Sequence, residues 1–418
     1  MPDYFAAETE GQVARRRVFY IPGYDPIHPR RYRELYRKEA ALQAEVSGYE
    51  ITLRPKTTKG PYGWHVSARM DGAEVESDIE VLVWSDIVRD SMAQGIAATY
   101  VQMVRTAAVY IGSGALFRLM RLRKGPVIAA LYPVGMLLLQ LALACLAGWG
   151  AGALMAWLLS LAVPMLAPLL GWATGLAVVW RVLAWFKAKD GKFFAYYLMN
   201  DYGFSAQSLG ANPPALEARM AEFGDAIAAA LREDVDEVLV VGHSSGAHLA
   251  VSILADLVRS GRAPSGRGGG PRLSFLSLGQ VVPMVSFLPK AGRLRDDLAY
   301  LSMRPEVPWI DVTAPGDGCA FALCDPVAVT GVAQAGKRWP LVVSAAFTQT
   351  LAPETWARLR WRFFRLHFQY LCHFDRPGDY DYFRITAGPL TLGRRYEGRE
   401  PSKSRIETPV SKYTSRVA

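Results

Sequence analysis

The sequence predicts an α/β protein whose mostly parallel sheet is covered by helices on both faces, with a two-helix transmembrane hairpin inserted into it. Three observations predict this fold class. Apolar runs of strand length alternate with helical patterns, one long stretch holds no charged residue, and a Gly-x-Ser-x-Gly motif lies between a strand pattern and a helix pattern. Alternating strands and helices are typical of a parallel sheet with crossover helices on both faces. With 418 residues, 51% of them hydrophobic, the chain can bury a large core.

The N-terminal elements begin with an apolar run that ends in Pro-Gly and precedes an amphipathic helical pattern. Together these predict a first β-α unit. Two alternating segments on either side of residues 56–61 predict an antiparallel hairpin. The expected elements are strands at 17–21, 49–54, 63–69 and 79–84, with helices at 29–46 and 87–122.

The charge-free stretch runs from Gly125 to Trp180. About 20 apolar residues span the hydrocarbon core of a bilayer, so this stretch is long enough for two crossings. The sequence predicts spans at 126–146 and 153–180, joined by a Gly-rich turn at 148–152. Pro164 and Pro168 are expected to kink the second span.

Basic residues flank the stretch on both sides. By the positive-inside rule both ends lie in the cytoplasm. We therefore expect an integral membrane protein, of the inner membrane in a bacterium, with two spans and with both termini and the catalytic domain cytoplasmic. The basic flanks also explain the net charge of +9, because they would contact the anionic headgroups of the lipid bilayer. The positive charge therefore does not require a nucleic-acid partner. The flanking cations are Arg118, Arg121, Arg123 and Lys124 before the stretch, and Arg181, Lys187, Lys189 and Lys192 after it.

The C-terminal elements return to the alternating pattern. We expect four parts: an N-terminal part of the α/β domain (1–124), the hairpin (125–180), a C-terminal part (181–393) and a polar tail (394–418) without fixed structure. The four cysteines show neither zinc-type pairs nor a disulfide pattern, which indicates free thiols. The expected elements are helices at 213–231 and 247–258, a Gly-rich loop at 259–272, and strands at 237–241, 273–278, 309–313 and 341–345.

The motif at 242–246, Gly-His-Ser-Ser-Gly, follows a β-branched run and precedes a helical pattern. This context predicts a nucleophile elbow, in which a serine stands on a strained strand-to-helix turn and the glycines avoid collisions with neighbouring backbone. Ser244 is the candidate nucleophile. The backbone N–H of Ser245 would face an oxyanion at the positive end of the following helix.

Over most of its soluble length the chain resembles an α/β-hydrolase of the lipase and esterase kind. The resemblance implies a triad in the chain order Ser, Asp or Glu, His. Of the six histidines, only two follow the last expected strand: His367, in His-Phe-Gln-Tyr-Leu, and His373, in Cys-His-Phe-Asp. We favour His367, because its His-x-x-Tyr-Leu setting is similar to that of many such enzymes, and His373 stays open. The helical pattern at 354–371 departs from the loop that normally carries this histidine.

The acid of the triad should follow a strand between the elbow and the histidine. Asp317 lies just past the strand at 309–313, where open parallel sheets place catalytic groups. Asp325, in Cys-Asp-Pro-Val, is the alternative, and Asp311 lies inside the strand. For the second oxyanion donor the resemblance points to the loop after the first strand, where Tyr24 follows Gly23; the His-Gly-Gly-Gly form of that loop is missing.

These residues predict a membrane-anchored serine hydrolase that cleaves a carboxylic ester or thioester, an acyl lipid being one candidate substrate, through an acyl-enzyme. The alternative is a non-catalytic membrane protein that uses the scaffold for binding or assembly. The sequence has no Walker loop, dinucleotide fingerprint or metal-ligand spacing, so we expect no cofactor and no metal.

Overall fold

The computed structural model describes residues 11–264 and 270–416, and it is built around an eight-stranded sheet. The strand order is β2-β3-β4-β1-β5-β6-β7-β8, and all neighbours pair in parallel except β2 with β3 and β3 with β4. The predicted α/β class and mostly parallel sheet are therefore confirmed. The strands are β1 (Arg15–Ile21), β2 (Glu50–Pro55), β3 (Gly63–Met70), β4 (Ala73–Val81), β5 (Glu237–His243), β6 (Arg272–Leu278), β7 (Trp309–Thr313) and β8 (Leu341–Ser344).

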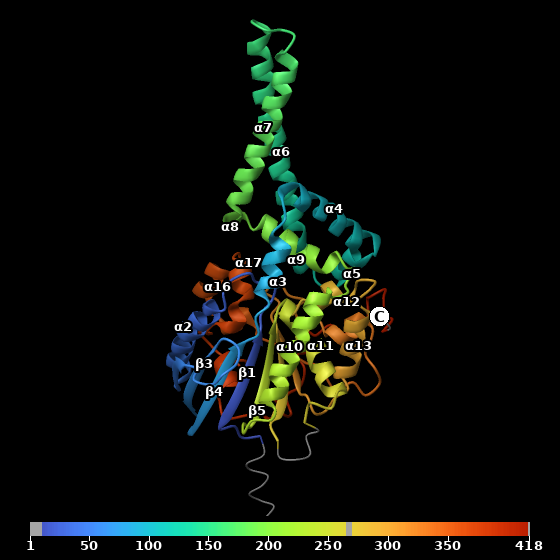
Figure 1. Ribbon diagram of the computed structural model, residues 1–418. Helices are drawn as coiled ribbons and strands as arrows, with labels where there is room; N and C mark the ends of the chain where they lie inside the picture. The colour runs from blue at the N-terminus through green and yellow to red at the C-terminus, as the bar shows by residue number, and fades with distance from the viewer. Residues whose placement is uncertain (1–10, 265–269, 417–418) are drawn as a thin grey trace, which may run out of the picture.

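Both faces of the sheet are buried, as the continuous apolar strands require. In β1, Val18 and Tyr20 belong to a core on one face, while Phe19 and Ile21 belong to a core on the other. In Figure 1, α10 (Pro214–Ala230), α11 (Ser245–Arg259) and α13 (Gly292–Leu301) lie in front of the central strands. The remaining helices of the C-terminal part are α12 (Val282–Ser286), α14 (Pro326–Thr330), α15 (Phe347–Thr350), α16 (Pro353–Leu359), α17 (Phe363–His367), the 3-10 helix Gln369–Leu371, α18 (Tyr382–Ala387) and α19 (Leu392–Arg395).

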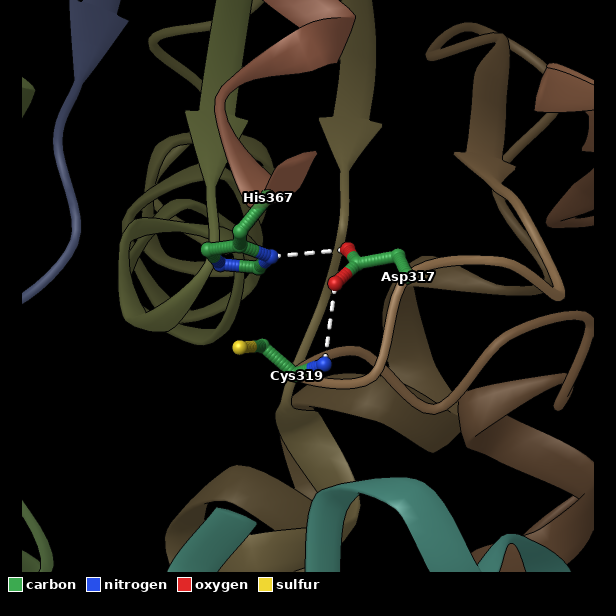
Figure 2. Close-up of side chains that lie close together, drawn as sticks. All are labelled: Asp317, Cys319 and His367. Carbon is green, nitrogen blue, oxygen red and sulfur yellow. Dashed lines mark hydrogen bonds and ion pairs between the residues drawn. The ribbon is translucent and has the colours of Figure 1, made fainter. Parts of the chain in front are cut away.

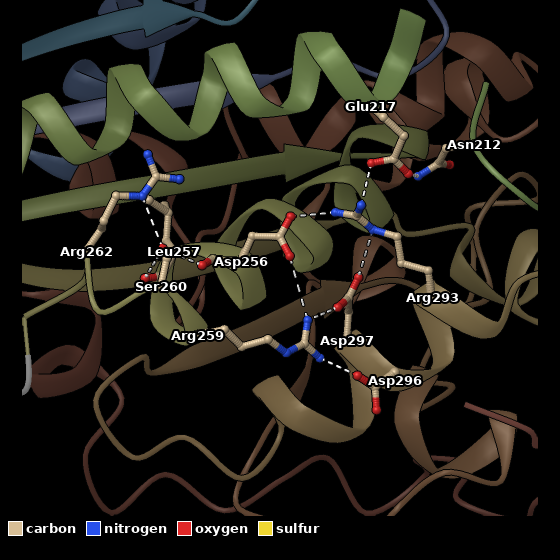
Figure 3. A network of polar contacts seen from close by, with 10 residues as sticks. All are labelled: Asn212, Glu217, Asp256, Leu257, Arg259, Ser260, Arg262, Arg293, Asp296 and Asp297. Atoms are coloured by element: carbon tan, nitrogen blue, oxygen red, sulfur yellow. Dashed lines mark hydrogen bonds and ion pairs between the residues drawn. The ribbon is translucent and has the colours of Figure 1, made fainter. Parts of the chain in front are cut away.

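Ion pairs join the three helices in front of the sheet (Figure 3). Arg293 of α13 contacts Glu217 of α10 and Asp256 of α11, at 2.5 Å in both cases. Arg259 of α11 returns to Asp296 of α13 at 2.6 Å. These groups are partly exposed, so each pair adds little stability by itself. Together they fix the position of α11, the helix that begins at the elbow.

The N-terminal half differs from its prediction in one long helix. After α2 (Arg30–Ser47), the pattern at 87–122 forms three helices, α3 (Ser85–Met92), α4 (Ile96–Gly112) and α5 (Ala115–Leu122). The second break falls at Gly114, whose φ of 75° is left-handed and ends a helix. The chain can therefore fold back over the end of the sheet instead of extending away from it.

The apolar stretch forms α6 (Lys124–Ser160) and α7 (Ala167–Ala188), followed by α8 (Asp190–Phe193) and α9 (Ala195–Ala206). Figure 1 shows α6 and α7 side by side, standing away from the sheet, with α4, α8 and α9 at their base. Both helices are long and apolar enough to cross a bilayer, and most of their surface is exposed. Their most exposed large side chains are Trp149, Trp172 and Leu169.

The predicted turn at 148–152 is wrong: α6 continues through it, and the chain turns at 161–166, which contains Pro164. Pro164 therefore kinks no helix, and Pro168 lies in the first turn of α7. The glycines serve close packing. A Cβ on Gly148 would lie 2.6 Å from the carbonyl oxygen of Gly175, and a Cβ on Gly152 would lie 2.6 Å from that of Gly171. Glycine breaks helices in water, but at Gly-x-x-x-Gly spacing it lets two membrane helices approach closely.

This packing predicts an asymmetric effect of substitutions in α6. Gly152→Val should lower the Tm of the detergent-solubilised protein, because overpacking costs about 1–3 kcal/mol. Gly150→Val is the matched control, because a Cβ at Gly150 meets nothing within 4 Å. Equal Tm values for the two variants would contradict the packing of α6 on α7.

The tail also differs from its prediction, since residues 394–416 lie against the domain. The Ile406 amide donates to the Leu323 carbonyl at 2.7 Å, and the Arg295 guanidinium donates to the Ser415 carbonyl at 2.6 Å. Contacts with loops distant in sequence hold this segment, and its local composition gives no sign of them. Residues 417 and 418 lie outside the described residues.

Candidate active site

The motif at 242–246 forms a sharp turn between β5 and α11. Ser244 has φ 56° and ψ −122°, a strained conformation for a residue with a side chain. A Cβ on Gly242 would lie 2.7 Å from Ala247 Cα, and a Cβ on Gly246 would lie 2.1 Å from the carbonyl oxygen of Ile21. Both positions therefore require glycine, and the turn presents Ser244 at the carboxyl end of the parallel strands.

The need for glycine can be tested by stability. Gly246→Ala should destabilise the fold by about 1–3 kcal/mol or more, because the added methyl collides with the backbone of β1. Chemical denaturation measures the change. In Gly112→Ala, the control, the methyl meets nothing within 4 Å and should leave stability unchanged or slightly higher. A Gly246→Ala protein as stable as that control would refute the described turn.

The loop after β1 packs directly on the serine. A Cβ on Gly23 would lie 2.9 Å from Ser244 Cβ. Two hydrogen bonds hold this loop: Trp84 Nε1 donates to the Pro22 carbonyl at 2.9 Å, and the Tyr197 hydroxyl donates to the Tyr24 carbonyl at 2.5 Å. Tyr24 and Ser245, the predicted oxyanion donors, both line the same cavity as Ser244. The Ser245 amide opens α11, so it has no carbonyl partner within that helix.

The predicted acid and histidine meet beside this cavity (Figure 2). His367 Nδ1 lies 2.7 Å from Asp317 Oδ2, and both side chains are buried. The Cys319 amide and the Tyr370 hydroxyl donate to the same carboxylate, at 2.9 and 3.0 Å. Burial favours the neutral acid, yet His367 and these hydrogen bonds hold the pKa of Asp317 below its usual value. Asp317 therefore accepts the Nδ1 proton and leaves Nε2 of His367 free to act as a base.

Ser244 and His367 both line the cavity, whose volume is about 90 Å³. His367 is the last residue of α17, and the helical pattern expected at 354–371 is interrupted at 360–362. The side chain therefore stands at a helix end, which reconciles the helical pattern with a catalytic position. The loop at 316–318 places Asp317 directly after β7, at the same edge of the sheet.

The alternative residues have other partners. His373 Nδ1 contacts Glu39 Oε2 at 2.6 Å. Asp325 caps α14 by accepting from the amides of Val327 and Ala328, and it pairs with Lys337. Asp311 is buried beside Ser277, and burial raises its pKa to about 8. None of these three lines the cavity of Ser244.

His243, which the sequence excludes as the base, has a supporting contact instead. Burial, with His367 beside it, lowers the pKa of His243 to about 3, so its ring is neutral. Its Nε2 lies 3.0 Å from the His367 carbonyl, which can only accept, so Nε2 carries the proton and donates. His243 thus fixes the backbone of the candidate base.

Sequence reasoning missed Asp201 of α9, which lines the cavity together with Ser244 and His367. Burial raises the pKa of Asp201 to about 7, and the nearby His367 limits that rise. No sequence signal marks Asp201, because only the tertiary fold brings α9, which follows the hairpin, to the cavity of Ser244.

The raised pKa of Asp201 predicts an unusual titration of this buried carboxyl. Burial penalises the charged form, so the carboxyl should stay protonated until about pH 7. Infrared difference spectra of the full-length protein should show a protonated carboxyl that ionises near pH 7, that is missing in Asp201→Asn, and that persists in Asp296→Asn, a change of equal charge at a partly exposed residue of α13. Identical spectra for Asp201→Asn and the parent protein would contradict the burial of Asp201.

One group of side chains could hold a metal ion. Ligand atoms of Asp317, Cys319 and His367 lie within 4.8 Å of one another, and this is a zinc-type donor set that sequence spacing does not reveal. Burial raises the pKa of the Cys319 thiol, which disfavours the thiolate that a metal requires. A metal on Asp317 and His367 would also compete with their 2.7 Å hydrogen bond, so the two uses of these residues exclude each other.

Comparisons of the chain with protein-family models, with curated proteins and with solved structures give no match.

Proposed function

We propose that the protein is a membrane-anchored serine hydrolase of the α/β-hydrolase type that cleaves a carboxylic ester or thioester. The observation that carries the proposal is the convergence of a strained Ser244 and a buried Asp317–His367 pair at one cavity. Strained backbone residues cluster at active sites and ligand-binding sites. A scaffold used only for binding would gain nothing from the strain at Ser244 or from the buried hydrogen bond between Asp317 and His367.

In the proposed reaction, His367 takes the Ser244 proton at Nε2 while the serine oxygen attacks the substrate carbonyl. The amides of Ser245 and Tyr24 stabilise the oxyanion. Collapse of the tetrahedral intermediate breaks the ester bond, and His367 protonates the departing alcohol or thiol. Water then attacks the acyl-enzyme by the same route and releases the acid. Asp317 orients the imidazole and stabilises its charged form.

We further propose that α6 and α7 cross a bilayer and that both termini and the Ser244 site lie in the cytoplasm. The exposed apolar surface of both helices and the basic residues at their base support this arrangement. A reporter enzyme that works only in the cytoplasm should be active when it is fused to the C-terminus. Activity of a reporter that works only outside the cytoplasm would overturn the orientation.

The activity is tested on purified full-length protein with p-nitrophenyl esters and acyl thioesters of graded chain length. We expect turnover that a serine-directed fluorophosphonate abolishes and that a chelator leaves unchanged. Turnover that disappears with the chelator and returns with Zn²⁺ would instead favour the metal use of Asp317, Cys319 and His367. Absence of turnover on every substrate, with Ser244 unreactive, would favour the non-catalytic alternative.

A further inference from the structure

The segment from the end of α16 to the candidate base carries an unusual surface. Residues 358–365 read Arg-Leu-Arg-Trp-Arg-Phe-Phe-Arg, and all four arginines are exposed. Among the described residues none of the four has an acidic partner. Between them Trp361 and Phe363 are exposed by 72% and 47%. Arg360 lies over the ring of Trp361 at 5.6 Å, but this contact neutralises no charge. Water-exposed aromatic rings and mutually repelling cations without acidic partners are unfavourable in water, which indicates that this surface binds a partner.

The segment lies at the base of the hairpin. In Figure 1, α17 is found just below α8, the short helix that follows α7. The ring of Phe364 contacts the ring of Phe194 at a centroid distance of 5.2 Å, and Phe194 directly follows α8. Phe194 is itself partly exposed. The aromatic and basic surface is therefore continuous with the end of the hairpin that meets the domain.

The same segment borders the candidate active site. Phe364 lines the Ser244 cavity, and His367 follows three residues later. The ring of Phe363 lies 3.1 Å from the position of a Cβ on Gly318, the residue after Asp317. The start of α6 reaches the same loop, since a Cβ on Gly125 would lie 3.3 Å from Gly318. Contacts made by this segment thus lie beside the cavity and beside the loop of the acid.

We propose that residues 358–365 are a second membrane contact, which seats the mouth of the Ser244 cavity on anionic lipid headgroups so that the substrate, a bilayer-resident acyl ester, enters from the membrane. Tryptophan and arginine suit this position because the ring lies at the headgroup level while the guanidinium binds phosphate. A hairpin already in the bilayer holds the segment at the surface. An acidic soluble protein would match the charges but not the position beside a membrane helix. The substrate half of the proposal rests on the proposed hydrolase function.

The contact is tested first without activity. In full-length Cys145→Ser protein, which lacks the exposed cysteine, Trp361→Cys is labelled with an environment-sensitive fluorophore and placed in nanodiscs. The parent Cys145→Ser protein gives the background label. In nanodiscs with about one-third phosphatidylserine we expect a blue shift of the label at position 361, and a smaller shift in pure phosphatidylcholine. The control is Arg69→Cys in β3, which should show no shift because residue 69 lies at the end of the sheet opposite the elbow. The same emission at both positions and in both lipids would overturn the contact.

The role in substrate entry is tested with two substrates. Arg358→Gln, Arg360→Gln and Arg362→Gln are combined, and the matched control combines Arg15→Gln, Arg69→Gln and Arg232→Gln, three exposed arginines at the opposite end of the sheet. In anionic proteoliposomes the first variant should hydrolyse a fluorogenic diacyl phospholipid roughly tenfold more slowly, since each Arg adds surface attraction. Hydrolysis of a short soluble ester should not change, and the control should match the parent on both.

The outcomes separate the two proposals. An equal loss on both substrates would indicate damage to the site and would overturn the entry role, as would no loss on either. A parent protein without activity on either substrate would refute the hydrolase function and with it the entry role. The fluorescence shift would still decide whether residues 358–365 contact anionic lipid.

Discussion

Ser244→Ala is expected to lower kcat for ester hydrolysis by a factor on the order of 10⁴ or more, because removal of the nucleophile leaves only binding and oxyanion stabilisation. The fold should survive. Alanine at 244 keeps the same strained backbone and fills less space, so Tm should stay close to that of the parent. Stopped assays with a chromogenic ester and thermal unfolding of the same sample measure both quantities.

Ser245→Ala is the matched control for that loss. The mechanism uses only the backbone N–H of Ser245, which alanine retains, so its kcat should change by no more than a few-fold. A Ser244→Ala enzyme that keeps most of its activity would remove the serine from the mechanism. A Ser245→Ala enzyme as inactive as Ser244→Ala would show that the elbow itself is sensitive to any change.

Asp317→Asn is expected to have the second largest effect, a loss of kcat on the order of 10³ to 10⁴. The amide of asparagine can donate to Nδ1, which would place the imidazole proton on Nε2, where it cannot accept from Ser244. His367→Gln removes the base itself and should lose at least as much. Steady-state kinetics on one ester measure both variants.

The controls are the residues that the sequence leaves as alternatives. His373→Gln breaks only the side-chain contact with Glu39. Asp325→Asn removes the charge that pairs with Lys337, while the asparagine oxygen can still cap α14. Asp325→Asn should lower Tm, yet both controls should keep kcat within a few-fold. Loss of activity in His373→Gln with activity retained in His367→Gln would reverse the assignment of the base.

Local signals account for what the sequence predicts well. Neighbouring residues are enough to predict the elbow, since a β-branched run, two obligatory glycines and a helix pattern together specify the turn at Ser244. The parallel strands are continuous apolar runs, and the hydrophobic pattern and the length of each run identify it as a strand. In the sequence, only its position after β7 favours Asp317 over Asp325. The hydrogen bond to His367, which distinguishes the two candidates, can be seen only in the folded structure.

Other features depend on contacts that no local pattern carries. Gly148 and Gly152 resemble a turn because helix propensity in water disfavours glycine, whereas their role is contact with Gly171 and Gly175 across the hairpin. Asp201 reaches the cavity only because α9 folds over the elbow. The break at Gly114, which starts that fold, is a single left-handed residue within an otherwise helical pattern.

The most direct test of the proposed triad is the site of covalent reaction with a fluorophosphonate. The purified full-length protein is treated with the probe, digested, and mapped by mass spectrometry, with Asp317→Asn treated in parallel. We expect a single adduct on Ser244 that forms much more slowly in Asp317→Asn. An adduct on another serine, or none on Ser244 in folded protein, would contradict the claim that Ser244, His367 and Asp317 form a working triad.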